Sequence, residues 1–131
     1  MIAPPPSAKT KKMAEEILKQ KRDDVQFLKC EERDIFFKVS DGNLYSMNAT
    51  YLENGILRIV RHSISVDFEQ RTKRVDVTYR KNVTDENFMA KDYDFQIQKS
   101  FDNDLDSATK MAMELAQEMN CVFTGVNKWT N

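Results

Sequence analysis

Hydrophobic and polar residues alternate along the middle of the chain. Across residues 60–69, apolar residues and one histidine occupy every second position, and polar or charged residues occupy the positions between them. Because successive side chains on a strand point to opposite faces, this pattern predicts a strand with one buried face. The alternation resumes over residues 75–79, after the polar segment 70–73. The two stretches predict an antiparallel hairpin, and other parts of the chain must cover its apolar face.

Apolar stretches upstream of this hairpin predict further strands. Residues 35–39 and 44–52 are each rich in apolar residues, and the turn sequence of residues 40–43 separates them. Asn54-Gly55, which follows the second stretch, is a strong signal for a two-residue hairpin. Each strand is therefore expected to lie beside the one before it, as in a meander.

The downstream part of the chain predicts one or two more strands. After a loop expected at residues 82–90, Tyr93, Phe95 and Ile97 alternate with polar residues. Alternation of this kind again predicts a strand. Residues 121–123 are suited to a final edge strand before the end of the chain.

A helix is predicted near each end of the chain. Ser7 can cap the first helix, and Ala14, Ile17 and Leu18 give it an apolar stripe. Residues 25–28 either continue this helix or begin the first strand. The second helix begins after the capping residues 102–104, and its apolar face contains Leu105, Ala108, Met111, Ala112, Leu115, Ala116 and Met119.

These elements predict an α+β fold: an antiparallel β-meander sheet of about five strands, with an N-terminal helix and a C-terminal helix packed on it. The chain has 131 residues, which suits a single domain, expected over residues 7–131. Residues 1–6 end in three prolines, so they are expected to form a flexible arm.

The composition is that of a folded globular protein, with 40% hydrophobic and 31% charged residues. No apolar run approaches the roughly 20 residues of a membrane span. The N-terminus also lacks the apolar core of a secretory signal, so the cytoplasm is the expected location. Cys30 and Cys121 lie far apart and in no metal-ligand spacing, and we expect them to be buried free thiols.

The sequence contains few residues suited to catalysis. None of its three glycines begins a phosphate-binding loop or a dinucleotide-binding fingerprint. The single histidine, His62, falls on the apolar side of its strand, whereas Ser63 and Asp67 fall on the opposite side. We therefore expect a partly buried structural histidine, no bound cofactor and no enzymatic activity.

Two sets of aspartates have a spacing reminiscent of metal ligands. The alternate aspartates of residues 102–106 match the first three ligands of a calcium loop, but Ser107 replaces its glycine and Met113 replaces its bidentate acid. Helix capping explains them better. Asp92 and Asp94 share one strand face, which keeps a Mg²⁺-dependent hydrolase as a third hypothesis, although no metal site is expected.

Charge is unevenly distributed, although the formal net charge is −1. Residues 56–81 include seven basic and three acidic side chains, and residues 82–131 include four and nine. Basic clusters hold phosphates, and a nearby aromatic ring can stack on a base. The candidate nucleic-acid-binding residues of the basic hairpin are Arg71, Lys73, Arg74, Tyr79, Arg80 and Lys81. The same cations can instead protect strand edges from aggregation, and Tyr79 follows the apolar alternation.

The expected function is that of a small intracellular binding or adaptor protein without catalytic activity. The lack of a catalytic constellation and the Ala/Met-rich face of the C-terminal helix favour contacts with another protein or with a second copy of this chain. The alternative is single-stranded DNA or RNA binding through the basic β-hairpin. No membrane partner is expected.

Overall fold

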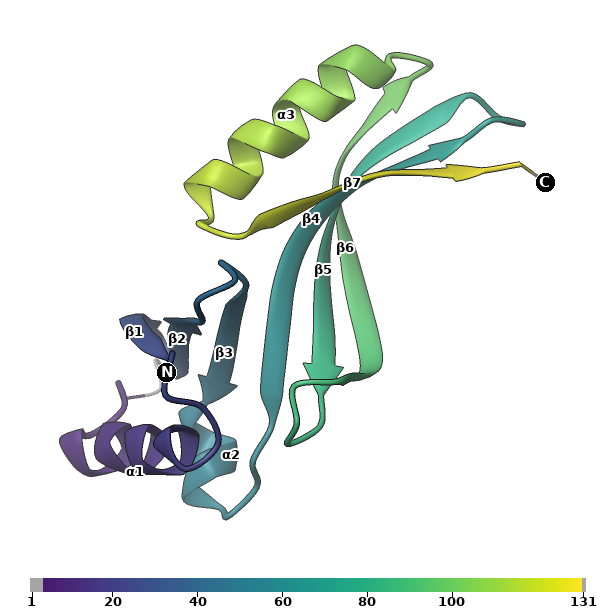
Figure 1. Ribbon diagram of the computed structural model, residues 1–131. Helices are drawn as coiled ribbons and strands as arrows, with labels where there is room; N and C mark the ends of the chain where they lie inside the picture. The colour runs from purple at the N-terminus through teal and green to yellow at the C-terminus, as the bar shows by residue number, and fades with distance from the viewer. Residues whose placement is uncertain (1–3, 131) are drawn as a thin grey trace. The chain divides into compact units, whose positions relative to one another are not determined.

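The computed structural model describes residues 4–130, which form three helices and seven strands (Figure 1). In chain order the elements are α1 (Ala8–Lys19), β1 (Gln26–Glu31), β2 (Asp34–Lys38), β3 (Leu44–Asn48), α2 (Ala49–Glu53), β4 (Ile59–Glu69), β5 (Arg74–Thr84), β6 (Ala90–Asp102), α3 (Leu105–Glu118) and β7 (Val122–Trp129).

The strands follow the order β1-β2-β3-β4-β5-β6, and β7 pairs with β4. Consecutive strands lie beside one another, as a meander requires, so the predicted α+β class with an N-terminal and a C-terminal helix is confirmed. Two details differ from the prediction. The sheet has seven strands instead of about five, and β7 runs parallel to β4 because α3 carries the chain back before β7 begins.

The chain divides into two compact units. Unit 1 comprises the residues up to Arg61 together with Asn82–Asp92, and unit 2 comprises His62–Lys81 together with the residues from Tyr93 onward. The backbones of β4, β5 and β6 pass from one unit into the other.

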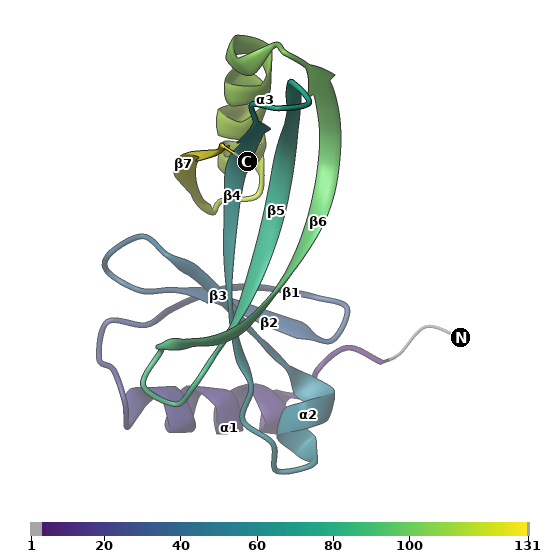
Figure 2. The same ribbon diagram turned by 90° about the vertical axis from the view of Figure 1, so that its right-hand side faces the viewer.

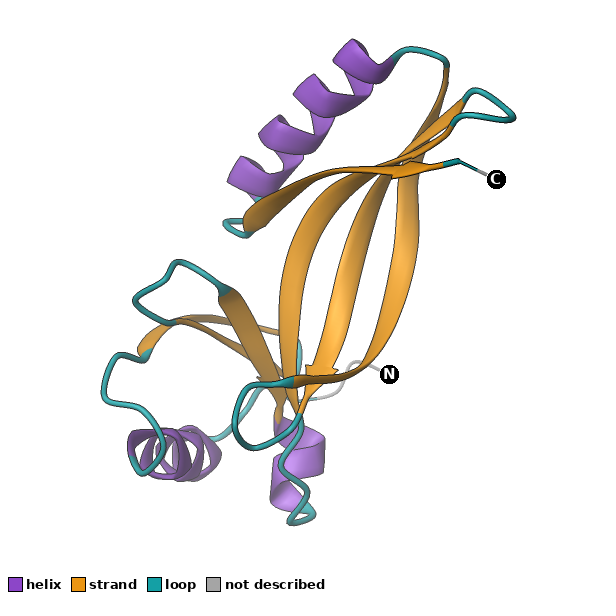
Figure 3. Ribbon diagram, turned by 45° about the vertical axis from the view of Figure 1, so that its right-hand side comes forward, coloured by secondary structure: helices purple, strands orange, loops and turns teal. Residues whose placement is uncertain are grey.

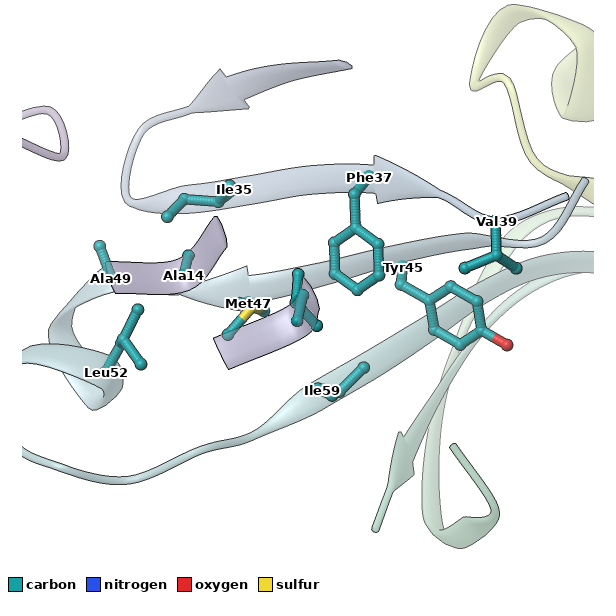
Figure 4. Close-up of a cluster of buried hydrophobic side chains, with 10 residues drawn as sticks. Ala14, Ile35, Phe37, Val39, Tyr45, Met47, Ala49, Leu52 and Ile59 are labelled. Carbon is teal, nitrogen blue, oxygen red and sulfur yellow. The ribbon is translucent and has the colours of Figure 1, made fainter. Parts of the chain in front are cut away.

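Unit 1 has its own hydrophobic core, built from β2, β3, α2 and the buried side of α1 (Figure 4). Ser7 caps α1 as predicted, since its hydroxyl accepts a hydrogen bond of 3.2 Å from the amide of Thr10. The apolar stripe of α1 buries Ala14 and Leu18 in this core, which also contains Phe37. The Phe37 ring stacks on Tyr45 at 5.5 Å between centroids. The helix ends at Lys19, and residues 26–28 belong to β1.

The predicted strand over residues 44–52 is only half correct. It ends at Asn48, whose side chain accepts hydrogen bonds from the amides of Thr50 and Tyr51 and so begins α2. The predicted hairpin at Asn54-Gly55 is wrong: Gly55, at φ +78°, follows the end of this short helix. The same Asn and Gly types serve hairpins and helix ends, so local sequence did not distinguish the two.

Unit 2 packs α3 against one face of the sheet that β7, β4, β5 and β6 form (Figure 3). Asp104 caps this helix by accepting a hydrogen bond of 3.1 Å from the amide of Ser107. Hydrogen bonding from the Ser107 side chain, and to a smaller extent from its amide, lowers the pKa of Asp104. Alanines four residues apart let the helix approach the sheet closely. The core of unit 2 contains Ile64, Val66, Val75, Val77, Ala108, Ala112 and Ala116.

The structure also shows where the loop before β6, the last strand and the two cysteines lie. The loop expected at residues 82–90 is shorter, because β5 continues to Thr84 and β6 begins at Ala90. The strand expected at residues 121–123 is β7, which extends to Trp129. Both cysteines are free thiols, but Cys30 is exposed and Cys121 is only partly buried, so the expected burial is wrong. Cys30 lies on β1, a strand exposed on both faces.

The predicted arm over residues 1–6 lies partly outside the described residues. In its described part, the Arg33 guanidinium donates hydrogen bonds to the carbonyls of Pro4 (2.9 Å) and Pro5 (3.3 Å), and Pro6 is buried. Within residues 4–130, no helix is both long and apolar enough to cross a membrane.

Candidate binding groove

A groove lies on the face of the unit 2 sheet opposite α3; we call this face the open face. Alternation along β4 and β5 sends Ile64, Val66, Val75 and Val77 to the helix and the residues between them to the open face. The groove has a volume of about 580 Å³. It is lined by Asp67, Glu69, Arg74, Asp76, Arg80, Tyr93, Phe95, Ile97, Asn127 and Trp129.

The floor of the groove contains an ion pair between Asp67 and Arg80. One Asp67 oxygen accepts hydrogen bonds from the Arg80 guanidinium (2.6 Å) and the Thr78 hydroxyl (2.9 Å). The other accepts a bond of 3.0 Å from the Asn127 amide, and Arg80 Nε donates to the Ser65 hydroxyl at 3.1 Å. These bonds hold both charged groups in place, since Asp67 has partners on β5 and β7 and Arg80 has two partners on β4.

A second ion pair joins Arg74 to Asp76. Arg74 Nε donates to Asp76 at 3.0 Å, and the Ser100 hydroxyl of β6 donates to the same carboxylate oxygen at 2.6 Å. The groove thus presents alternating guanidinium and carboxylate groups that largely neutralise one another.

Large apolar side chains border this polar floor. Tyr93, Phe95 and Ile97 line it from β6, and Trp129 lines it from β7; each is between 40% and 61% exposed. The Arg80 guanidinium lies 5.9 Å from the Tyr93 ring centroid and 5.8 Å from that of Phe95, within the range of cation–π attraction. The groove therefore combines exposed aromatic rings with fixed polar groups.

Trp129 and Asn127 reach the open face because β7 shifts its register at Gly125. Ile64 of β4 pairs with Phe123, but Val66 pairs with Val126, so β7 has one extra residue between these pairs. Gly125 adopts φ +102°, a conformation that side chains other than glycine rarely adopt. Without the extra residue, alternation would place Asn127 and Trp129 on the same face as Phe123, which packs on the core beneath α3.

The groove has a small excess of negative charge. Three carboxylates and two guanidinium groups line it. Glu69 pairs with Trp129 across β4 and β7, and its carboxylate makes no hydrogen bond or ion pair with any residue in the described part of the chain. The spare carboxylate favours a cationic or neutral ligand over an anionic one.

The candidate nucleic-acid-binding residues divide between different parts of unit 2. Arg74 and Arg80 line the groove together, but each is paired with an aspartate. Arg71 and Lys73 are exposed in the turn between β4 and β5. Tyr79 packs against the core on the α3 side, with the Lys81 ammonium 5.5 Å from its ring centroid.

His62 is buried, at 4% exposed, and its Nδ1 forms a hydrogen bond with the Tyr79 hydroxyl. Burial lowers the pKa of His62 to about 4, with a smaller contribution from the positive charge of Lys81. The expected placement of His62 on the apolar side of its strand is confirmed. Within residues 4–130, no three or more His, Cys, Asp or Glu side chains gather as metal ligands would.

The sequence did not indicate most of the groove residues as members of a binding site. Tyr93, Phe95 and Ile97 gave the alternation that predicts β6, but alternation shows only that they share a face, not that this face is uncovered. Trp129 lies after Gly125 near the end of the chain, where a simple alternation from Phe123 assigns it to the wrong face. An isolated glycine in a strand was the one available signal for the shift.

No family model matches the chain, and comparisons with curated proteins and with solved structures gave no match.

Proposed function

We propose that the protein is a non-catalytic binding protein that acts through protein–protein contacts, with the groove on the open face of unit 2 as its contact surface. The observation that carries the proposal is the gathering of exposed Tyr93, Phe95, Ile97 and Trp129 around one groove. Exposed apolar patches of this kind mark interaction sites, and aromatic side chains are enriched among the residues that dominate binding energy.

The polar floor supports a protein ligand. The charged groups of the floor are already paired with one another, Asp67 with Arg80 and Asp76 with Arg74. A partner that covers them therefore leaves no buried charge without an opposite charge beside it. Glu69, beside Trp129, is available to a lysine or arginine of the partner. We therefore expect the ligand to be a protein segment with apolar and basic side chains.

The test is selection of binding peptides from a random displayed library, with the full chain as bait. Selected peptides should bind the wild type, and Trp129→Ala and Phe95→Ala should each weaken binding about tenfold or more, as loss of an aromatic anchor does. Met113→Ala is the matched control, because Met113 is equally exposed, at 56%, but lies on α3 and not in the groove. Failure to select any peptide, or equal binding by the Trp129→Ala variant, would contradict the proposal.

Single-stranded nucleic acid is the second candidate ligand. Its support is that Arg71 and Lys73 make no ion pair with the residues described and lie in the turn that leads to Arg74 at the groove. Wild-type protein should then bind a fluorescent oligothymidine at low salt, and Arg71→Glu with Lys73→Glu should abolish this binding. Absence of wild-type binding at low salt would exclude the candidate.

A further inference from the structure

The groove on the open face crosses the sheet instead of following one strand. In unit 2, β4 and β5 lie between β7 and β6 (Figure 2). Trp129 lines the groove from β7, and Tyr93 and Phe95 line it from β6. Neighbouring strands are about 4.8 Å apart, so the two apolar borders are about 14 Å apart. A ligand that contacts both borders must lie over the polar floor, because a strand added at the edge of β6 or β7 would reach only one of them.

The floor between these borders has spare hydrogen-bond donors. Nε and Nη2 of both guanidinium groups bond neighbouring side chains, but Nη1 of Arg74 and of Arg80 makes no hydrogen bond within residues 4–130. The indole N–H of Trp129 also makes none with these residues. By contrast, both carboxylate oxygens of Asp67 and one of Asp76 already accept hydrogen bonds. A ligand that displaces water from the floor must therefore supply acceptors.

The conformation of the ligand backbone decides whether it can supply these acceptors. An α-helix uses its carbonyl oxygens in its own hydrogen bonds, so it would leave the guanidinium donors without partners. A β-strand brings an N–H donor with almost every carbonyl, and the floor has few acceptors left for them. A proline-rich segment in the polyproline II conformation has no internal hydrogen bonds and lacks an N–H at each proline. This backbone complements the donors of the floor best.

We propose that the groove binds a proline-rich segment of another protein in the polyproline II conformation, with a lysine or arginine at the end nearest Trp129. This inference rests on the proposed function, since it names the kind of segment that the groove binds. Proline-rich segments dock in grooves lined by aromatic rings, and about five residues, at a rise of about 3.1 Å each, span the two borders. The basic side chain lies against the Trp129 ring and beside the Glu69 carboxylate, which attract its positive charge.

The prolines of this chain itself are not available as the ligand. The Arg33 guanidinium donates hydrogen bonds to the carbonyls of Pro4 and Pro5, and Pro6 is buried. All of these residues belong to unit 1. Because the carbonyls of Pro4 and Pro5 already accept hydrogen bonds there, we expect the segment to come from another protein.

Two displayed libraries of nine-residue peptides test the backbone conformation. Two positions, three residues or one polyproline II turn apart, are fixed as proline in one library and as alanine in the other, and the remaining positions are random. With the full chain as bait, the proline library should give at least about tenfold more bound clones. This advantage should disappear with Trp129→Ala as bait and persist with Met113→Ala, which lies outside the groove. Far-ultraviolet circular dichroism confirms that each bait is folded.

The position of the basic side chain is tested with Glu69→Gln. Clones selected by the wild type should have a lysine or arginine at one end, and Glu69→Gln should bind them about three- to tenfold more weakly. Glu114→Gln is the matched control, because Glu114 is an exposed carboxylate on α3 and does not line the groove. This variant should bind the clones as the wild type does.

The possible results separate this inference from the proposed function. Equal numbers of bound clones from the two libraries would overturn the inference and leave the proposed function in place, and an advantage for the alanine library would indicate a helical ligand instead. Selected clones without a basic end, or with unchanged binding to Glu69→Gln, would overturn the assigned place of the basic side chain. If neither these libraries nor the fully random one gave any bound clone, the proposed function would fail as well.

Discussion

His62 shows how a single buried side chain can couple stability to pH. The imidazole is buried in unit 2, and its Nδ1 bonds the Tyr79 hydroxyl, whose ring stacks on it at 5.7 Å between centroids. Both residues follow the alternation of their strands, so their burial could be predicted from the sequence. Their hydrogen bond could not, because it depends on the register between β4 and β5. Burial away from water disfavours the charged imidazolium, and Lys81 adds to this effect.

We predict that the protein loses stability as the pH falls from about 6.5 to about 4. The pKa of His62 is about 4 in the folded state and 6.5 without these surroundings, so the unfolded chain binds a proton that the folded chain does not. The contribution of His62 to the free energy of unfolding is fully present above pH 6.5. It is lost as the pH falls to about 4, which lowers the free energy of unfolding by up to about 3 kcal/mol. Urea denaturation of wild type and His62→Asn across this range measures it. Parallel pH profiles for the two proteins would contradict the prediction.

At the scale of elements, periodicity predicted the strands well and local turn signals predicted their ends poorly. The alternation of residues 60–69 and 75–79 corresponds to β4 and β5. Asn48 and Gly55 instead lie at the two ends of a helix, because the side chain of Asn48 caps α2 and Leu52 becomes buried in the core of unit 1. Whether Asn and Gly form a hairpin or a helix end depends on which alternative buries the neighbouring apolar residues.

Gly125 decides which face of β7 carries the groove residues, so its replacement should affect both stability and the groove. We predict that Gly125→Ala lowers the free energy of unfolding by about 1–3 kcal/mol. The cost comes from the backbone at φ +102°, since an added Cβ would meet no atom within 4 Å. Urea denaturation followed by the fluorescence of Trp129, the single tryptophan, reports the change in stability and in the indole environment together.

Val126→Ala serves as the control for this prediction, because Val126 is exposed on the same strand. Its stability should change by about 0.5 kcal/mol or less, and its Trp129 emission should match the wild type. An equal loss in the two variants would mean that the register shift does not depend on the glycine.

At the scale of the whole molecule, two hydrophobic cores are joined by continuous strands. The predicted single domain over residues 7–131 contains two compact units, and β4, β5 and β6 contribute residues to both. If these strands unfold in one unit, the parts of the same strands that lie in the other unit lose the backbone pairing next to them. We therefore expect cooperative unfolding of the chain.

We predict that Leu18→Ala, a cavity-forming change in unit 1, also lowers the midpoint of the Trp129 fluorescence transition in unit 2. Leu18 is fully buried, so the expected loss is about 2–5 kcal/mol. Circular dichroism and Trp129 fluorescence should give the same shifted midpoint. Met13→Ala, on the same helix but only partly buried, is the milder control. An unshifted fluorescence midpoint in Leu18→Ala would show that the two units unfold independently.

The sequence by itself determined the α+β class, the two terminal helices, the cap at Ser7, a cap within residues 102–104, and the face of β4 and β5 that carries the apolar side chains. Each of these depends on local periodicity or on a side chain that bonds its own neighbouring backbone. The sequence did not indicate that Ser63, Ser65 and Thr78, on the other face, are also buried. Only the tertiary structure decided that β7 pairs parallel to β4, that α3 covers one face and that Tyr93, Phe95 and Trp129 share a groove. Those features depend on pairing between distant strands, and periodicity shows which residues share a face without showing what lies against it.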